Sequence, residues 1–472
     1  MHSLDPRYRW NSPQGYRDLL RLCVPLVASS IAASVMMFTD RIFLANYSLE
    51  AIAASLPAGV MKFTITSIFI GIVGYTQVFV AQYTGAGQHN RAGATLWQGL
   101  YISLIFGFGH YFFFLLGPGL FTLAGHDPSI VALEMEYFRV LIYGTPLELM
   151  MVTMSAFLCA IGRARLVMLV NLAGMVLNIP LDYILIFGLG SGPDALIQPM
   201  GVYGAALATV FSWAFNFLLL SFFIFTNRME KSHGTRSNFV LDWQLFKRLL
   251  RFGYPSGIQL FMEIFAFGFF AFVVGKLGLF YLSANNIVFS IEALSFFPMV
   301  GLGQAVSILV GNAIGRGAPK DGESVTVSGI VLSTSFVFIM LFMFLIFPEP
   351  LLGIFMSNSL DPQEASNLTR VGTIILRFVV IYCLFDGLYL CCFGAVKGAG
   401  DVWYPMFAMA FWAVVGLILP IIALFYLGWA NIYSLWAVLV FYVLAVTATG
   451  VHRFLSRKWM VMKVIESVPS KG

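Results

Sequence analysis

The stretch RLCVPLVASSIAASVMMFTDRIFLA, residues 21–45, indicates the fold class of this chain. Between Leu22 and Ala45 the only charged residues are Asp40 and Arg41, close to the end of the run. An apolar run of more than about 20 residues is long enough for a helix to cross a bilayer, and it is too long for the apolar part of a cleaved secretory signal. Because apolar and polar residues do not alternate, the run predicts a membrane-spanning helix and not a strand.

The composition agrees with a membrane protein. Hydrophobic residues make up 59% of the 472 residues, charged residues 10% and aromatic residues 16%. A soluble domain carries roughly 25% charged residues, so a soluble protein is excluded, and the aromatic content excludes a disordered chain. A transmembrane barrel needs alternating segments, which are lacking. The sequence therefore predicts an all-α membrane protein with twelve transmembrane helices, at residues 19–46, 51–83, 93–121, 130–159, 166–189, 200–226, 248–275, 281–313, 324–347, 366–396, 403–427 and 431–455.

The basic residues indicate how these helices are oriented. Lys and Arg collect in the cytoplasmic loops of membrane proteins. If both termini are cytoplasmic, 21 of the 27 Lys and Arg residues fall on the cytoplasmic side, and an odd number of helices would destroy this distribution. We therefore expect a multi-pass membrane protein with both termini cytoplasmic. The excess of Lys and Arg in the cytoplasmic loops accounts for the net charge of +5. A nucleic-acid partner is therefore not expected.

The two halves of the chain are similar to each other at one constant shift in residue number. LLRLCVP at 19–25 corresponds to LLRFGYP at 249–255, and three glycines of the first half recur in the second at the same shift: Gly71, Gly85 and Gly87 correspond to Gly301, Gly315 and Gly317. Such an internal repeat with six helices per copy predicts two pseudo-symmetric six-helix lobes around a central cavity, related by an axis along the membrane normal. The expected domains are a cytoplasmic N-terminal segment 1–18, an N-lobe 19–226, a cytoplasmic linker 227–247, a C-lobe 248–455 and a cytoplasmic C-terminal tail 456–472.

Sequence motifs of enzymes are lacking. The chain contains neither GxxxxGK[ST], which would cradle nucleotide phosphates, nor HExxH, which would bind catalytic zinc. Its five cysteines lie in apolar stretches without the spacing of metal ligands. We therefore expect no enzymatic activity and no cofactor.

Ionisable residues inside the apolar helices are the best candidates for a functional site. A charge at the centre of a membrane helix costs at least about 2.5–3.5 kcal/mol, so it marks a site by default. Glu263 follows the basic Arg251 by about three helical turns, and Asp386 precedes Lys397 by a similar length of helix. Both carboxylates are therefore expected near the membrane midplane, and Tyr382 is one turn from Asp386 on the same face. Two acids and a phenol suit a proton or a dehydrated Na⁺, which prefers oxygen ligands.

The first half carries a second candidate cluster. Asn178 and Asp182 are spaced i, i+4 on one predicted helix, so they share a face. Asp40 lies late in the first helix and Thr209 early in the sixth, which places all four residues in the outer half of the bilayer. An alternative for Asp40 is an ion pair with the neighbouring Arg41 near a helix end.

Lys62 and Glu292 are related by the same shift as the repeated segments. Symmetry-equivalent positions near a central axis can meet, so we hypothesise an outer-side ion pair between the lobes. The alternative is that each side chain separately reaches the membrane interface. Glu148 is a further acid inside the membrane, for which the sequence indicates no partner.

Several segments together carry a resemblance to a known family. They are RLCVPLVASSIAASVMMFTDRIFLA (21–45), VLNIPLDYILIFG (176–188), MGVYGAALAT (200–209), YPSGIQLFMEI (254–264), GLGQAVSILVGNAIGRG (301–317) and the run from Asp386 to GAVKGAGD (394–401). With these segments the chain resembles the multidrug and toxic compound extrusion (MATE) family over nearly its whole length. The resemblance implies twelve helices in two lobes and cation-coupled drug export.

The resemblance also implies site residues. By position they are Asp40, Asn178, Asp182 and Thr209 for the N-lobe cation site, and Glu263, Tyr382 and Asp386 for the C-lobe cation site of the bacterial NorM-type branch. Lys397 departs from the pattern, because members often carry Arg near this position, but the charge is kept.

We therefore expect a monomeric secondary antiporter that exports organic cationic or amphipathic drugs in exchange for Na⁺ or H⁺ by alternating access. Small-molecule drugs, organic cations and membrane lipids are its expected partners. One alternative is a flippase for lipid-linked precursors or polysaccharides, which would need a strongly cationic cavity. A less favoured one is a membrane-embedded lipid-modifying enzyme, which would need an acid or His motif at the interface. Carboxylates serve both Na⁺ and H⁺, so the sequence leaves the coupling ion open.

Overall fold

The computed structural model describes residues 10, 15–123, 128–190, 196–355 and 362–466. Most of the predicted N-terminal segment 1–18 and the last six residues of the predicted tail lie outside the described residues. Within the described ranges the chain is almost entirely helical, and the only β pairing is an isolated bridge between Leu189 and Ile197.

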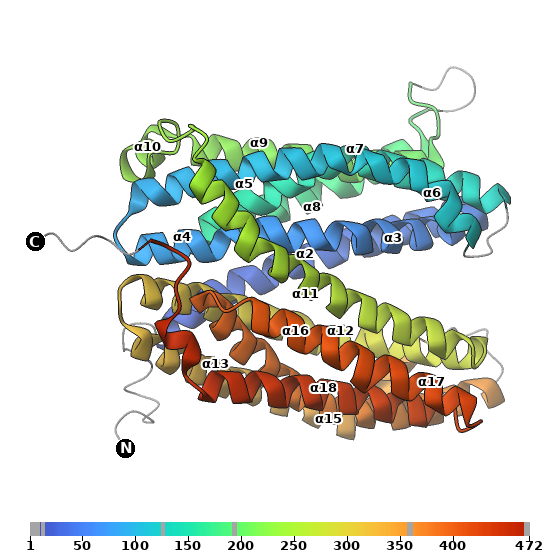
Figure 1. Cartoon of the computed structure of the whole chain (residues 1–472). Coiled ribbons are helices and arrows are strands. Elements are labelled where there is room, and N and C mark those ends of the chain that lie inside the picture. The colour runs from blue at the N-terminus through green and yellow to red at the C-terminus, as the bar shows by residue number, and fades with distance from the viewer. Residues whose placement is uncertain (1–9, 11–14, 124–127, 191–195, 356–361, 467–472) are drawn as a thin grey trace, which may run out of the picture. The chain divides into compact units, whose positions relative to one another are not determined.

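The prediction of twelve long apolar helices is confirmed. Twelve helical spans in the described part of the chain are long and apolar enough to cross a membrane. Figure 1 labels their α-helices. The spans consist of α2 (Tyr16–Tyr47), α3 with α4 (Leu49–Gly74, Thr76–Gly85), α5 with α6 (His89–Gly109, Tyr111–Leu123), α7 (Pro128–Ala160), α8 (Ala164–Phe187), α9 (Gly201–Ile224), α11 (Trp243–Gly275), α12 (Leu279–Gly315), α13 (Pro319–Ile346), α15 (Pro362–Ala399), α16 with the π-helix η2 and α17 (Trp403–Trp412, Ala413–Ile418, Leu419–Tyr426) and α18 (Ile432–Leu455). Three short helices are α10 (Asn227–His233), α14 (Pro348–Gly353) and η3 (Lys458–Val461).

Side chains that satisfy free backbone N–H groups set several helix starts. Asn431 accepts hydrogen bonds from the N–H groups of Tyr433 and Ser434 at the start of α18, both at 3.0 Å. Helix α11 begins at Trp243, before the predicted start at 248. The reason is Asp242, whose Oδ1 accepts the backbone N–H of Gln244 at 3.1 Å and of Leu245 at 3.0 Å.

The chain forms two compact units. Unit 1 comprises residues 1–27 and 262–472, and unit 2 comprises residues 28–261. The boundaries therefore lie inside α2 and α11, and not at the polar linker. The lobes 19–226 and 248–455 remain a prediction, since the start of each of these two helices packs with the unit that contains the other half of the chain.

Close glycine contacts explain why the starts of α2 and α11 each pack in the unit that contains the other half of the chain. These contacts also follow the internal repeat. In unit 2, a Cβ at Gly71 would lie 2.6 Å from the Cα of Gly257 on α11, so this crossing requires glycine. In unit 1, a Cβ at Gly301 would lie 2.7 Å from Cγ2 of Val27 on α2. The shift that relates Gly71 to Gly301 also relates Val27 to Gly257, so the two contacts are equivalent in the repeat.

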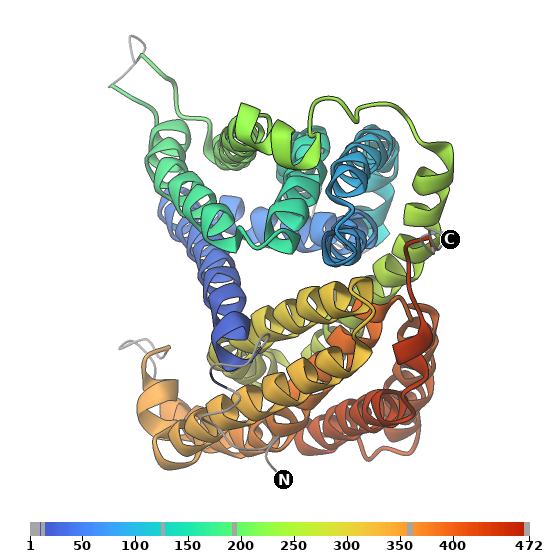
Figure 2. The same cartoon turned by 90° about the vertical axis from the view of Figure 1, so that its left-hand side faces the viewer.

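Each unit is built around central helices. In unit 2, α7 packs against α3, α5 and α9, and α8 packs against α9. In unit 1, α15 packs against α12, α13 and α18. Figure 2 looks along these helices and shows that they run roughly parallel within each unit. Several polar residues of these helices are buried, among them Asp40, Asp182 and Asp386, and the candidate sites lie there.

Candidate functional site

Three of the four predicted N-lobe site residues come together in unit 2. Asp40 on α2 is 6% exposed, and its Oδ2 accepts a hydrogen bond from Oγ1 of Thr209 on α9 at 3.4 Å. Asp182 on α8 is fully buried and interacts electrostatically with the Asp40 carboxyl group, and neither oxygen of its own carboxyl group has a hydrogen-bond partner among the described residues. The site therefore places two acids from different helices where a single small cation can serve both.

Asn178, the fourth predicted residue, lies one turn before Asp182 on α8 and is also fully buried. Neither atom of its side-chain amide has a hydrogen-bond partner among the residues that the structure describes. An unpaired buried amide costs about 1–3 kcal/mol, so its oxygen is available to an added ligand. The structure leaves the i, i+4 prediction on this helix intact but shows no direct contact between Asn178 and Asp40.

Tyr137 is a further residue of this cluster, which the sequence analysis missed. It lies on α7, is 9% exposed, and is close enough to Asp40 and Asp182 to interact electrostatically with both. Nothing in the sequence distinguishes one tyrosine in an apolar helix from the other tyrosines of the chain. Arg41 also interacts with Asp40 electrostatically, but Asp40 faces inward to Thr209, unlike the alternative of a surface ion pair.

The predicted C-lobe acids lie in unit 1. Asp386 on α15 is 6% exposed, and its Oδ2 has no hydrogen-bond partner in the described part of the chain. It interacts electrostatically with Glu292 on α12 and, more weakly, with Glu263 on α11. The hydroxyl of Tyr389, one turn beyond Asp386, donates to Oε2 of Glu263 at 3.4 Å, and Lys397 interacts electrostatically with the same carboxylate.

Glu292 belongs to this C-lobe cluster, although the sequence analysis placed it elsewhere. Its carboxylate lies beside the hydroxyl of Tyr382, the fully buried phenol predicted for the site. The Tyr382 ring stacks on Trp436 of α18, with ring centroids 6.3 Å apart and an angle of 25° between the rings. The signal that could have found Glu292 was present, because it is an acid inside an apolar helix, but only the packing of α12 on α15 reveals its neighbours.

Lys62 on α3 forms an ion pair with Glu148 on α7, the acid for which the sequence indicated no partner. Both residues are buried, and the Lys62 ammonium also lies 4.5 Å from the ring centroid of Trp213, on the ring face. An ion pair between Lys62 and Glu292 would require Lys62 to exchange Glu148 for Glu292. That pair would join the two units, and it stays a prediction.

Metal-binding geometry in the strict sense is lacking in the described residues. No group of three or more His, Cys, Asp or Glu side chains there is arranged to hold a metal ion. The oxygen donors of the N-lobe cluster are two carboxylates, one amide and one hydroxyl, a set that fits a proton or a weakly held Na⁺ better than a tightly bound divalent metal.

The fold and these clusters together define a class of protein, namely a polytopic helical membrane protein with buried acids of the kind that transporters use. A family model described as MatE matches residues 25–184 and 255–422, more than two thirds of the chain. The chain belongs to this family, the MATE family of multidrug efflux transporters.

Curated relatives match over most of the chain. A protein named "Probable multidrug resistance protein NorM" from Rhizobium meliloti (strain 1021) is 26% identical over 408 residues, which are 85% of this chain and 85% of the relative. A protein with the same name from Neisseria meningitidis serogroup B (strain MC58) is 26% identical over 431 residues, 90% of each chain.

Solved structures share the fold. A multidrug resistance MATE family transporter of the MOP superfamily in an outward-facing conformation has a TM-score of 0.84 at 21% identity, covering 96% of this chain and 99% of the other. A MOP superfamily transporter from Pyrococcus furiosus, for which the reverse polarity of the binding pocket suggests a different function, has a TM-score of 0.83 at 21% identity, covering 96% and 98%. At this identity the likenesses establish the fold alone.

Proposed function

We propose that this protein is a secondary active antiporter that exports organic cationic or amphipathic drugs in exchange for Na⁺ or H⁺ by alternating access. Family membership and the names of the relatives support drug export. The coupling by a small cation is supported by the buried acids, and one contrast between them carries the argument.

The contrast concerns which buried acids have a cation supplied by the chain. Glu148 is neutralised by Lys62 in a direct ion pair. The buried carboxyl groups of Asp40 and Asp182 interact with each other, and two nearby carboxylates repel each other strongly where the effective dielectric constant is low. A proton or Na⁺ removes this repulsion, so the Asp40–Asp182 pair is the place where an external cation gains the most free energy.

The same contrast appears in unit 1. Glu263 interacts with Lys397 and receives a hydrogen bond from Tyr389, whereas Asp386 and Glu292 are mutually repelling acids. We therefore assign Asp386 and Glu292, with Tyr382, as the residues that take a cation in this unit. Glu263 shares the site through Asp386 and is held in place by Tyr389 and Lys397.

Coupling to drug export needs a difference in affinity between conformations. A cation shifts the equilibrium between inward-facing and outward-facing states only if it binds one of them more tightly. In this proposal cation binding to the acids favours the drug-free state, so that entry of the cation down its gradient releases drug outside. The abundance of Met and aromatic residues, 21 Met and 47 Phe, suits adaptable binding of flat organic cations.

The test is efflux of ethidium and norfloxacin from membrane vesicles with imposed Na⁺ or pH gradients. The variants are Asp40→Asn, Asp182→Asn, Glu263→Gln, Asp386→Asn and Glu292→Gln. Glu136→Gln is the matched control, because Glu136 is an exposed acid on the membrane-spanning helix α7. We expect the Asp40 and Asp182 variants to lose gradient-driven efflux and the control to keep it.

Two results would contradict the proposal. One is undiminished coupled efflux in all five variants at normal expression. The other is a wild type that moves no organic cation under either gradient, which would favour the lipid-precursor flippase. Comparing a Na⁺ gradient without a pH gradient and the reverse identifies the coupling ion.

We further propose a monomer in the bacterial inner membrane, the membrane being suggested by the bacterial relatives. The distribution of Lys and Arg supports cytoplasmic positions for both termini. Fusions of alkaline phosphatase and green fluorescent protein to the C-terminus test this orientation. Fluorescence without phosphatase activity is expected, and the reverse result would invert the topology.

A further inference from the structure

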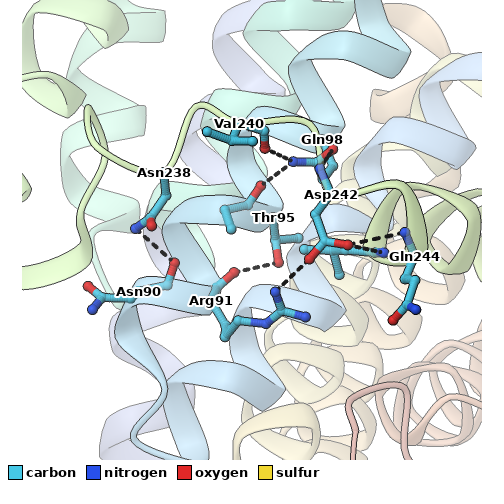
Figure 3. Close-up of polar contacts among 10 residues, drawn as sticks. Asn90, Arg91, Thr95, Gln98, Asn238, Val240, Asp242 and Gln244 are labelled. Carbon is cyan, nitrogen blue, oxygen red and sulfur yellow. Dashed lines mark hydrogen bonds and ion pairs between the residues drawn. The ribbon is translucent and has the colours of Figure 1, made fainter.

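The linker between α10 and α11 is held firmly against the start of α5. In the close-up of Figure 3, the Arg91 guanidinium of α5 contacts Oδ2 of Asp242 at 2.6 Å. The side-chain amide of Gln98 donates to the carbonyl of Val240 at 3.2 Å and accepts the N–H of Asp242 at 3.3 Å. Because the backbone of the linker uses its polar groups on α5, its position is defined and its side chains are oriented.

The same arrangement exposes large apolar side chains of the linker. Phe239, Val240, Leu241 and Trp243 are 55%, 67%, 51% and 55% exposed, although their backbone is fixed. Four such side chains close together in the chain form an apolar patch, and contiguous patches of this kind mark a binding surface or a contact with membrane.

The patch borders an apolar groove of about 320 Å³ on unit 2. One wall is formed by α5, with Tyr101, Leu104 and Ile105, and the other by the linker and the start of α11, with Leu241, Trp243 and Phe246. The rings of Trp243 and Phe246 stack at a centroid distance of 5.2 Å and an angle of 14°, which makes that wall flat and continuous.

A basic stripe runs along α11 from the groove. Trp243, Lys247 and Arg251 are exposed and spaced i, i+4, i+8, so they lie on one side of the helix. The Lys247 ammonium lies 5.3 Å from the ring centroid of Trp243. Of the two acids of this region, Asp242 is engaged by Arg91, and Glu230 accepts the backbone N–H of Arg236 at 2.5 Å. Asp242 is therefore paired with Arg91 and not with the basic residues of the stripe.

We infer that this surface is a binding site for an anionic membrane phospholipid, with an acyl chain in the groove and the phosphate at Lys247 and Arg251. Helix α11 has 33 residues and is therefore about 50 Å long, so its ends extend beyond a hydrocarbon core of about 30 Å into the headgroup regions. One wall of the groove lies within the membrane span His89–Gly119 and the other lies at the start of α11, so the groove opens on lipid. Trp at this level and basic side chains beside it match the chemistry of an anionic headgroup region.

The experiment measures lipid retained by the purified full-length protein in native mass spectrometry. The probes are dioleoyl phosphatidylglycerol and dioleoyl phosphatidylcholine, which share acyl chains and differ in headgroup charge. The wild type should prefer phosphatidylglycerol, and each of Lys247→Gln and Arg251→Gln should lower that preference about fivefold at low salt. High salt should weaken the preference of the wild type as well, because exposed charges are screened.

Lys276→Gln is the matched control. Lys276 is an exposed lysine just beyond the other end of α11, and it is not one of the groove-lining residues. Like Lys247 with Trp243, it lies four residues after an aromatic residue, and its ammonium is 5.3 Å from the ring centroid of Phe272. This variant should keep the wild-type preference. Leu241→Asn tests the groove, because an exposed wall residue is made polar without disturbing the core, and retention of both lipids should fall equally.

The inference is overturned if the variant with both Lys247→Gln and Arg251→Gln retains the same headgroup preference as Lys276→Gln. Unchanged retention of both lipids by Leu241→Asn would overturn the acyl-chain position. No transport step enters this assay, so its result is independent of the proposed antiport.

Discussion

Individual buried charges in this protein are compensated in different ways. Lys62 gains a carboxylate from Glu148 and an aromatic face from Trp213, so that its charge is satisfied by the chain alone. The Asp40 carboxyl receives one hydrogen bond from Thr209 and faces a second acid, Asp182. The first arrangement is complete, and the second is completed by a cation. This difference lets structural charges be separated from functional ones.

Glu148→Gln should destabilise the protein by about 3–5 kcal/mol, because it leaves the buried Lys62 ammonium without its counter-ion. The measurement is the thermal unfolding midpoint of the purified protein in detergent. Replacing both members, as Lys62→Met with Glu148→Leu, should recover most of the loss. The control is Glu323→Gln, which removes the partner of the exposed Arg457 and should cost less than about 1 kcal/mol. Equal losses in the two single variants would contradict the buried pair.

His233, outside the membrane-spanning helices, should make stability depend on pH. Burial, followed by His89 and Arg163, lowers the pKa of His233 to about 4, below the usual value of about 6.5. The folded state thus favours the neutral ring of His233. The contribution of this preference to the free energy of unfolding is complete above about pH 6.5 and is lost as the pH falls to about 4. The unfolding midpoint of His233→Gln should therefore fall less than that of the wild type over this interval.

The control for this pH dependence is His452→Gln, since His452 is an exposed imidazole at the end of α18. Its unfolding midpoint should follow the wild-type pH profile. A His233→Gln profile that also coincides with wild type would show that this ring is not held in its neutral form.

Among the elements, the start of α11 depends on a single side chain. One oxygen of Asp242 caps the helix, and the other accepts the Arg91 contact. Asp242→Ala should lower stability by about 1–2 kcal/mol, the sum of a lost cap and a lost, partly exposed ion pair. Asp321→Ala is the control, since Asp321 is 52% exposed, also lies in the first turn of a helix, and contacts Arg316 only at 3.7 Å.

The stability that Asp242→Ala removes should become smaller at acidic pH. Burial raises the pKa of Asp242, but the Leu245 N–H and the Arg91 guanidinium together offset it, so the pKa is lowered overall. A lowered pKa means that this stability is present above about pH 4 and disappears as the pH falls further. Unfolding midpoints of wild type and variant should converge there, and a constant difference would exclude a role for the carboxylate charge.

For the whole molecule, the exchange of helix starts between the two compact units depends on close backbone contacts. Gly71→Ala should be strongly destabilising, by about 1–3 kcal/mol or more, because its Cβ would lie 2.6 Å from the backbone of Gly257. Gly301→Ala, its repeat equivalent, should cost less, because its nearest neighbour is the end of the Val27 side chain, which can move. Expression level and unfolding midpoint are the measurements.

Gly74→Ala is the control on the same helix as Gly71, because its Cβ would make an ordinary contact of 3.9 Å with Val152. It should be close to wild type. If Gly71→Ala were equally harmless, the crossing of α3 and α11 would not require glycine, and the packing of the start of α11 in unit 2 would need another explanation.

The sequence alone determined the twelve helices, because a bilayer forces each apolar run of more than about 20 residues to satisfy its backbone internally as a helix. It also predicted several acids inside the membrane, since the cost of a charge there is independent of its partners. Spacing on one helix, as for Asn178 and Asp182, was likewise available from the sequence.

Only the tertiary structure decided which of these residues meet. The pairing of Lys62 with Glu148, the place of Glu292 beside Tyr382 and the contribution of Tyr137 all depend on contacts between different helices. Helices whose surfaces are apolar on all sides carry little information about which face turns inward. Packing of side chains and close glycine contacts selects that face, and with it the partner of every buried charge.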